Sequence, residues 1–235
     1  MPVVCEREYG NGMFGHPVGA FHRGVKTLNN ASKFWNRPAV QIYRDISRGY
    51  DQYPFSVREM LKAHGSEPIT SLRIVRTPLS PLVSAALRVI TWGEVDDRIR
   101  NSPYDHLFHL KVIVNNRYSI EKQRTLSFTI ELSIPPRSDT EEVNVGGRHL
   151  TIQEFLDHCA KVMGKSMFSY DFQRNNCQHF VANLLRSNGF AHHDTFILQD
   201  IPSIFEGMHH GTRKIVNSIT DVGNRTVQLQ EGRGI

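Results

Sequence analysis

The 235-residue chain is poor in cysteine and lacks any long apolar run, and each shortage excludes a class of protein. Its three cysteines, Cys5, Cys159 and Cys177, have neither the spacing of metal ligands nor the number expected of a disulfide framework. We therefore expect a reducing compartment, no metal and no other cofactor. No apolar stretch of about 18 residues and no signal peptide is present, which predicts an intracellular, cytoplasmic protein without a transmembrane segment.

A strong nucleic-acid signal is also missing. Basic residues exceed acidic ones only slightly, 28 against 23, so the formal net charge is +5 and the pI is near 9.2. The chain has no concentrated basic run and no interleaved aromatic residues of the kind on which bases stack. Twelve histidines are present, but the pairs at 192–193 and 209–210 diverge on any regular element, and no cysteine or carboxylate completes a zinc ligand set.

The segment around Cys177 carries the clearest chemical signal. Asn175 or Asn176 is expected to cap a helix whose first turn contains Cys177, because a short side-chain carbonyl accepts from the free N–H groups of a first turn. Apolar residues recur with helical period at positions 180, 181, 184 and 185, and Gly189 is the expected end. The positive end of the helix dipole favours a thiolate, so Cys177 is a candidate nucleophile. The alternative is a buried cysteine that fills space, as we expect of Cys159.

A thiolate nucleophile needs a base, and the sequence offers two histidines on one predicted strand. Residues 104–114 read YDHLFHLKVIV, and the alternation from Phe108 onward is typical of a strand with one packed face. His106 and His109 are an odd number of positions apart, so their imidazoles project to opposite sides. The alternation alone does not choose between them.

A second strand follows the turn signal at residues 115 and 116. A three-residue loop over 115–117 pairs apolar with apolar positions, so we prefer it to a two-residue loop. In that register Gln123 lies opposite His109 and Glu121 lies opposite Lys111, and either Gln123 or Glu121 could hold the imidazole in one tautomer. The alternative is that Glu121 and Lys111 form only a solvated cross-strand pair.

The order of a histidine strand, a second strand, a helix and a loop leading into Asn176-Cys177-Gln178-His179-Phe180 resembles the circularly permuted papain-like hydrolases and acyltransferases. Two branches are similar, the lecithin retinol acyltransferase-like proteins with an N-C-E-H-F motif and the PPPDE isopeptidases with N-C-N-H-F. The alternating apolar run after His109 matches the family's base. The resemblance covers residues 72–188, about half of the chain.

The resemblance implies an α+β fold, in which a small antiparallel sheet carrying the histidine packs against a helix with the cysteine at its N-terminus. It implies that Cys177 attacks an acyl, amide or isopeptide bond, with His109 as the base and a thioester as the intermediate. The substrates it implies are a lipid acyl group or a ubiquitin-like protein conjugate.

The oxyanion of such a reaction would be stabilised by the backbone N–H of Cys177 and a side-chain amide of Gln178 or Asn176. Two departures from the family pattern stand out. Gln178 replaces the acidic or asparagine residue of the motif, and only Ser119, Glu121 and Gln123 stand where the acyltransferases commonly have a second histidine.

The sequence predicts an irregular N-terminal arm over 1–53, a catalytic domain over 54–190 and a C-terminal extension over 191–235. Further helices are expected at 57–64, 82–91, 151–163 and 207–222, with capping boxes at Ser56 and Thr151, and Ser80 as another cap. Further strands are expected at 69–76, 125–134 and 143–150, with the last two paired. The apolar helix at 82–91 is either a core element or a contact surface, which leaves peripheral membrane contact open.

Two alternatives to an enzyme remain at this level. One is a catalytically silent domain of the same fold that binds a protein or a lipid. The other is a basic nucleic-acid or virion-associated interaction protein, which rests only on the net charge and the irregular arm.

Overall fold

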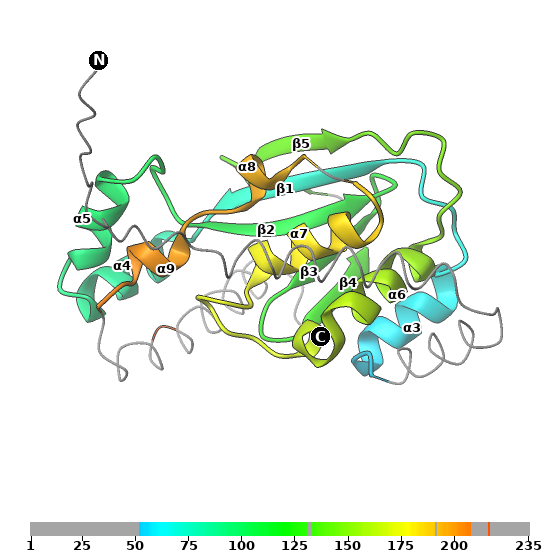
Figure 1. Ribbon diagram of the computed structural model, residues 1–235, viewed down its shortest axis with the longest axis horizontal. Coiled ribbons are helices and arrows are strands. Elements are labelled where there is room, and N and C mark those ends of the chain that lie inside the picture. Colours follow the sequence, from blue (N-terminus) through cyan, green and yellow to red (C-terminus); the bar gives the residue numbers. More distant parts are fainter. Residues whose placement is uncertain (1–51, 131–132, 191, 208–215, 217–235) are drawn as a thin grey trace, which may run out of the picture.

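The computed structural model describes residues 52–130, 133–190, 192–207 and 216, and within them five strands form one antiparallel sheet (Figure 1). The strand order is β4-β3-β2-β1-β5. The strands are β1 Leu72–Pro78, β2 Phe108–Val114, β3 Tyr118–Lys122, β4 Leu126–Ile130 and β5 Asp139–Val143. The expected α+β class, with a small antiparallel sheet packed against helices, is confirmed.

Three helices, α3 Phe55–His64, α6 Ile152–Met163 and α7 Cys177–Ser187, cover one face of this sheet (Figure 1). Alternate β2 residues, among them Leu110 and Val112, are fully buried in one core with Phe155 of α6 and Phe180 of α7. Apolar side chains recur every two residues along the strands and every 3.6 residues along the helices. The apolar faces that the sequence predicts therefore meet in this core.

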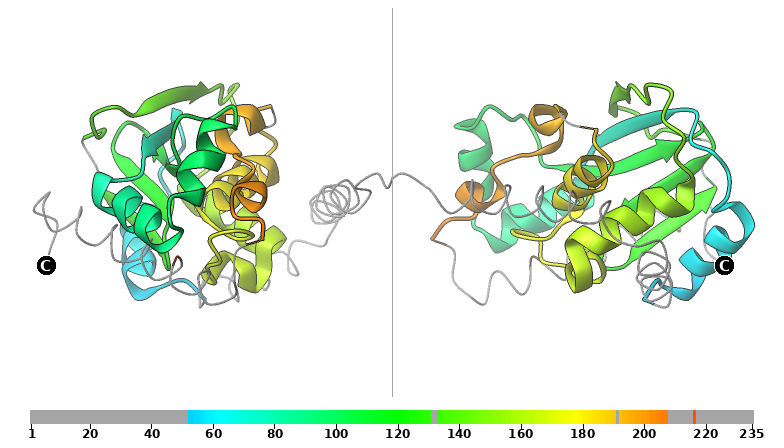
Figure 2. Two further views of the ribbon diagram at one scale, coloured as in Figure 1. Left: turned by 90° about the vertical axis from the view of Figure 1, so that its left-hand side faces the viewer. Right: turned by 45° about the vertical axis from the view of Figure 1, so that its right-hand side comes forward.

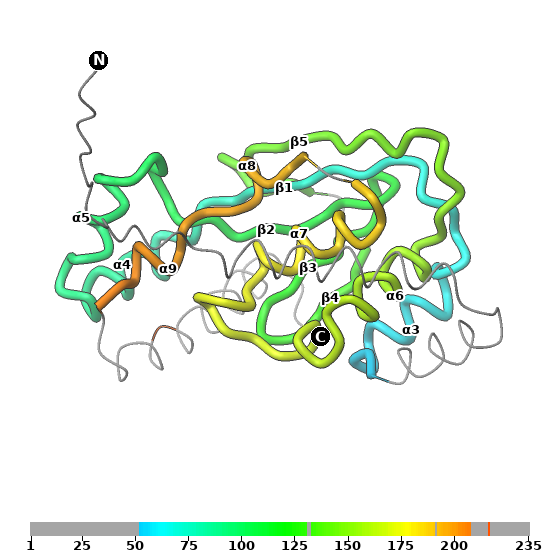
Figure 3. The backbone as a smooth tube through the Cα atoms, viewed as in Figure 1, coloured from blue at the N-terminus to red at the C-terminus, as the bar shows by residue number. Residues whose placement is uncertain are grey.

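A second, smaller apolar cluster lies at one end of the sheet, where the connection between β1 and β2 forms α4 Pro81–Ile90 and α5 Glu94–Arg100 (Figure 2). The short helix α9 Ile201–Ile204 packs against α5. Between α7 and α9 the chain passes through α8 Asp194–Ile197, which lies beside β1 and β5 (Figure 3). His193 before α8 bonds Glu141 of β5, and Arg76 of β1 donates to the Phe196 carbonyl.

The β2–β3 hairpin has the three-residue loop that the sequence predicts. Lys111 pairs with Glu121 and Val114 pairs with Tyr118. Asn115 and Asn116 both take left-handed backbone angles, with φ of 54° and 52°, a conformation that asparagine tolerates better than most residues. The β2–β3 ladder ends at the Lys111–Glu121 pair, although the other edge of β2 stays paired with β1 as far as Phe108.

Most predicted caps are confirmed. Thr151 forms a complete capping box with Glu154 at the start of α6, and Ser80 accepts from the Val83 N–H at the start of α4. The box predicted at Ser56 is wrong, because α3 already begins at Phe55 and its N-cap is a proline with no side-chain cap bond.

Other expectations need correction. The strand that follows β4 covers 139–143 rather than the expected 143–150, and it pairs with β1 rather than with β4. Helix α5 was not predicted, because its sequence, EVDDRIR, has no apolar residues at a helical period. Helix α4 is half core and half surface: Val83 and Leu87 are buried, whereas Val89 is 73% exposed. Residues 1–51 of the predicted arm, and the helix predicted at 207–222 apart from Gly207 and Val216, lie outside the described residues.

Candidate active site

Cys177 is the first residue of α7, and Asn176 is its N-cap. The Asn176 Oδ1 atom accepts from the backbone N–H of Gln178 at 2.9 Å and of His179 at 3.2 Å, and the Asn176 carbonyl accepts from Phe180. A helix leaves its first four N–H groups without intrahelical partners. The Asn176 side chain supplies an acceptor to two of these groups, Gln178 and His179, whereas the Cys177 N–H has no acceptor within the described part of the chain.

A buried lysine holds the loop that leads into α7. Lys122, the last residue of β3, is 0% exposed and donates to the Ser166 carbonyl at 2.7 Å and to Asn175 Oδ1 at 2.8 Å. The Asn175 amide in turn donates to the carbonyls of Ser166 and Ser169. Burial lowers the pKa of Lys122 to about 8. Sequence reasoning missed this lysine, because its strand position is one that apolar residues usually occupy.

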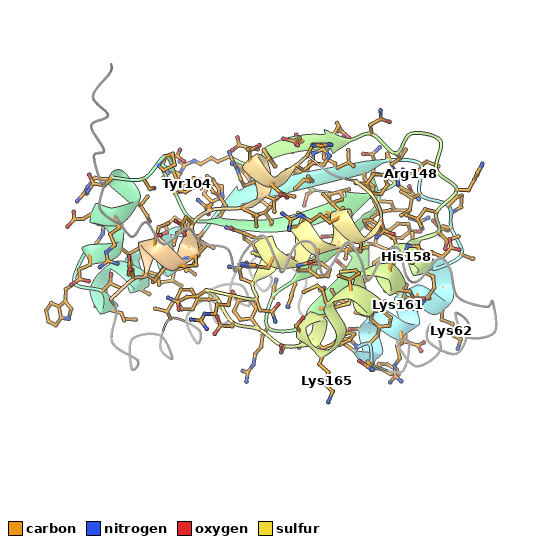
Figure 4. All side chains as sticks on the ribbon, in the orientation of Figure 1. Lys62, Tyr104, Arg148, His158, Lys161 and Lys165 are labelled. Carbon is orange, nitrogen blue, oxygen red and sulfur yellow. The ribbon has the colours of Figure 1, made fainter. Side chains whose placement is uncertain are left out.

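The opposite end of α7 is fixed just as firmly. The Asn188 carbonyl accepts from Arg148 at 2.8 Å, and Asn188 Oδ1 bonds the ring of His158 at 2.7 Å. In Figure 4 Arg148 and His158 both lie on the right-hand side of the molecule, and Tyr104 lies on the left-hand side, at the α4–α5 end. Helix α7 is therefore anchored at both termini.

His109, the second residue of β2, meets both Cys177 and Glu121. Its Nε2 atom lies 2.6 Å from Glu121 Oε2, and its ring is hydrogen-bonded to the Cys177 thiol. Because Nε2 faces the carboxylate, Nδ1 is the ring nitrogen left for the sulfur. The thiol also accepts from the backbone N–H of Leu110. The last β2 residue that pairs with β3 is Lys111, which is next to Leu110. The first turn of α7 therefore reaches the β2 backbone at a place where β3 no longer pairs with β2.

These contacts shift the pKa of all three groups. Burial alone would lower the pKa of His109, but the Cys177 thiolate and the hydrogen bonds to Cys177 and Glu121 raise it from 6.5 to about 10. Burial alone would raise the pKa of Cys177, but the imidazolium, its hydrogen bond and two backbone N–H groups lower it. Burial is likewise outweighed at Glu121, whose pKa is lowered by His109 and Lys111. The geometry therefore favours a thiolate–imidazolium pair.

The remaining predicted site residues take supporting places. Gln123 does not pair across from His109, since the ladder ends before it, and its side chain bonds Glu121 instead. The Asn176 amide donates to the Phe172 carbonyl at 2.6 Å, and the Gln178 amide donates to Gln199 at 2.9 Å. The two amides proposed for the oxyanion are thus bonded within the protein.

Two other residues of the region are now placed. The imidazole of His106 is 61% exposed and lies beside Asp105, away from the thiol. Gln199 was missed by sequence reasoning. The signal that could have found it is that Gln199 and Asp200 interrupt the apolar residues at 196–198 and 201, because a polar side chain that is buried with such neighbours requires a partner.

Cys177 and His109 line a small cavity of about 50 Å³. Its other walls are almost wholly apolar and come from β2, α4, α9 and the segments after β1, before β2 and before α7. They are Leu79, Leu87, Leu107, Phe108, Tyr170, Phe172, Ile201, Phe205 and Val216 beside Asn176 and Gln178. Cys177 itself is 7% exposed. A larger cleft of about 470 Å³ runs between α4, α5 and residues 105–107. Leu79, Leu87 and Leu107 line both spaces, so they form the wall between the cleft and the thiol.

Residues 52–130, 133–190, 192–207 and 216 contain no group of three or more His, Cys, Asp or Glu side chains placed to hold a metal ion. No helix in this part of the chain has the length and apolar character needed to cross a bilayer.

The chain matches no protein-family model, no curated protein and no solved structure.

Proposed function

We propose that the protein is a cysteine-nucleophile hydrolase or acyltransferase of the permuted papain-like type, with Cys177 as nucleophile and His109 as base. The observation that carries the proposal is the continuous chain from the Cys177 thiol through His109 to the Glu121 carboxylate, built at the N-terminus of α7. A nucleophile, a base and a group that orients the base are the parts that thiol catalysis requires.

The reaction follows from where the protons sit. The Cys177 thiolate attacks the carbonyl carbon of an acyl, amide or isopeptide bond, and the Cys177 N–H donates to the oxyanion that forms. The His109 imidazolium gives its proton to the leaving alcohol or amine, and a thioester remains on the sulfur. Water or an amine then attacks the thioester carbonyl and His109 takes its proton. The bond between the carbonyl carbon and the sulfur breaks, the acyl product leaves, and the thiolate–imidazolium pair is restored. Glu121 holds the imidazole in one tautomer throughout, as a positioning residue.

The walls of the site favour a substrate with an apolar acyl group. The cavity beside the sulfur is lined by aliphatic and aromatic side chains, and the leucine wall separates it from a cleft that falls in the size range of ligand pockets. We therefore propose that the acyl part enters from the cleft past Leu79, Leu87 and Leu107. A lipid acyl group fits these walls best, and a ubiquitin-like conjugate is the second substrate class to test.

Iodoacetamide labelling tests the nucleophile directly, because the reagent is a small electrophile that reacts with the thiolate form of cysteine. At pH 7 we expect alkylation of Cys177, located by peptide mass spectrometry, and a rate at least about tenfold lower in His109→Ala, since loss of the imidazolium raises the thiol pKa by one unit or more. Cys159 is the matched control: it is 0% exposed, and its thiol pKa is raised by burial. It should stay unlabelled in the native protein.

Substrate turnover then separates the branches. Medium-chain acyl thioesters, phospholipid vesicles and a ubiquitin-like isopeptide conjugate are offered side by side to the wild type and to Cys177→Ser. Product that forms with the wild type and is absent with Cys177→Ser supports the proposal and identifies the substrate class. A native Cys177 that alkylates no faster than a free cysteine with a pKa near 9 would contradict the enzymatic assignment.

One observation favours a second candidate, a catalytically silent domain of the same fold. The thiol is 7% exposed and its cavity of about 50 Å³ holds little more than a water molecule or two. In such a protein the Cys177–His109 pair would serve stability alone. The silent domain predicts that Cys177→Ser lowers stability without removing any measurable turnover.

A further inference from the structure

Two buried glutamines join the strand of the base to the helix of the nucleophile. Gln178 follows Cys177 directly in α7, and Gln199 lies in the segment between α8 and α9. The Gln178 Nε2 atom donates to Gln199 Oε1 at 2.9 Å, and the Gln199 backbone N–H donates to Gln178 Oε1 at 2.8 Å. Gln178 is 2% exposed and Gln199 is 7% exposed.

The pair also holds the residues directly before His109. Gln199 Oε1 accepts from the Phe108 N–H at 3.0 Å, and Gln199 Nε2 donates to the His106 carbonyl at 2.7 Å. Gln178 Nε2 lies 3.5 Å from the Phe108 carbonyl, a longer contact that completes the ring. Gln199 thus hydrogen-bonds the backbone at the start of β2 as a neighbouring strand would. These bonds lie where the chain passes from α5 into β2.

The amide groups of the pair have partners on both sides of the site. A buried donor or acceptor that loses its partner is costly, so the favourable arrangement is one in which all of these bonds are made together. Because the bonds span from residue 178 to residues 106–108, they fix the first turn of α7 relative to the start of β2. The Cys177 thiol and the His109 imidazole are carried by the residues adjacent to these two anchor points.

We propose that Gln178 and Gln199 are positioning residues that set the separation of the Cys177 thiol and the His109 imidazole, and thereby the stability of the ion pair between them. The inference rests on the proposed thiol chemistry. It also assigns a role to the departure of Gln178 from the glutamate of the N-C-E-H-F motif, since an amide supplies both the donor and the acceptor that this contact uses, whereas a carboxylate supplies no donor.

The test replaces Gln199 by methionine, which keeps the length and volume of the side chain and removes its hydrogen bonds. The rate of Cys177 alkylation by iodoacetamide is measured from pH 4 to pH 10. We expect the midpoint of the thiol titration to rise by about one unit in Gln199→Met, which lowers the rate at pH 7 by up to about tenfold. Gln178→Met should give a similar shift, and the double variant should give less than the sum, because both substitutions remove one shared contact.

Gln153→Met is the matched control. Gln153 lies on α6 and donates to Asp157 at 2.9 Å, so this variant loses a glutamine hydrogen bond away from the thiol and should keep the wild-type pH profile. Circular dichroism and thermal unfolding report folding for each variant. Should Gln199→Met fail to fold, Gln178→Met decides the question.

The outcomes separate the two proposals. A pH profile in Gln199→Met and Gln178→Met that superimposes on the wild type, with only the melting temperature lowered, would overturn the positioning role while leaving the thiol enzyme intact. A wild-type Cys177 that titrates near 9 would instead remove the proposed function itself.

Discussion

The carboxylate of Glu121 offers the sharpest test of the electrostatics of the site. Its Oε2 atom lies 2.6 Å from His109 Nε2, and the two side chains are 10% and 17% exposed, so water screens this contact only weakly. A hydrogen bond to a charged group contributes about 1.5 to 3 kcal/mol, and each pKa unit corresponds to about 1.36 kcal/mol. Glu121→Gln should therefore lower the pKa of His109 by about one to two units from its value of about 10.

The sign for Cys177 is opposite. When the imidazolium of His109 is less stable, it stabilises the thiolate less, so the thiol pKa rises in Glu121→Gln. The pH range in which thiolate and imidazolium coexist therefore narrows at its acidic and at its basic limit. The His109 titration is followed by NMR of the imidazole Cε1–Hε1 group, assigned with His109→Asn, and the Cys177 titration by thiolate absorbance near 240 nm.

Glu142→Gln is the control for this charge change. Glu142 pairs with Arg73 on the surface and its side chain is 63% exposed, so its removal should leave both titrations unchanged. If Glu121→Gln leaves the His109 titration where it is in the wild type, the carboxylate does not stabilise the imidazolium and the reasoning fails.

Three further outcomes are expected. Asn176→Ala removes the cap of α7 and the bond to Phe172, and should lower the free energy of unfolding in urea by about 1 to 2 kcal/mol. Leu184→Ala, at a fully buried position of α7, should cost about 2 to 5 kcal/mol in the same assay without moving the thiol titration of the folded protein. Burial raises the pKa of Asp157 to about 6, so its ionisation opposes folding as pH rises from about 4 to 6. Asp157→Asn should therefore gain up to about 3 kcal/mol relative to the wild type between pH 4 and pH 7, measured by urea unfolding at both pH values.

Local periodicity was enough to predict the parts of the site that lie within one element. The alternation around His109 predicts β2, the turn at residues 115–117 predicts the register, and a cap at Asn175 or Asn176 predicts to within one residue where α7 begins. These features depend on residues a few positions apart, and each is confirmed. The contact between Cys177 and His109, by contrast, was expected from the resemblance, because periodicity does not say where a helix ends relative to a distant strand.

The features that were missed depend on non-local partners. β5 is a polar edge strand whose only strand neighbour in the described sheet is β1, so neither its position nor its pairing follows from its own sequence. Helix α5 begins after Gly93 without a side-chain cap and buries only Val95. Gln199 sits outside any predicted element, and its partners lie 21 residues away in α7 and more than 90 residues away before β2.

The length of the β2–β3 turn has a consequence for sequence change in this protein. Side chains alternate between faces of a strand, so the insertion or deletion of one residue in the loop would bring Ile120 or Lys122 to the place of Glu121 and leave the imidazole without its carboxylate. Point substitutions at Asn116 would only strain the turn, whereas those at Asn115 would also break the hydrogen bonds of its side chain to Pro68, Thr70 and Ser71. We expect natural variants to differ more in the identity of residues 116 and 117 than in the length of the loop.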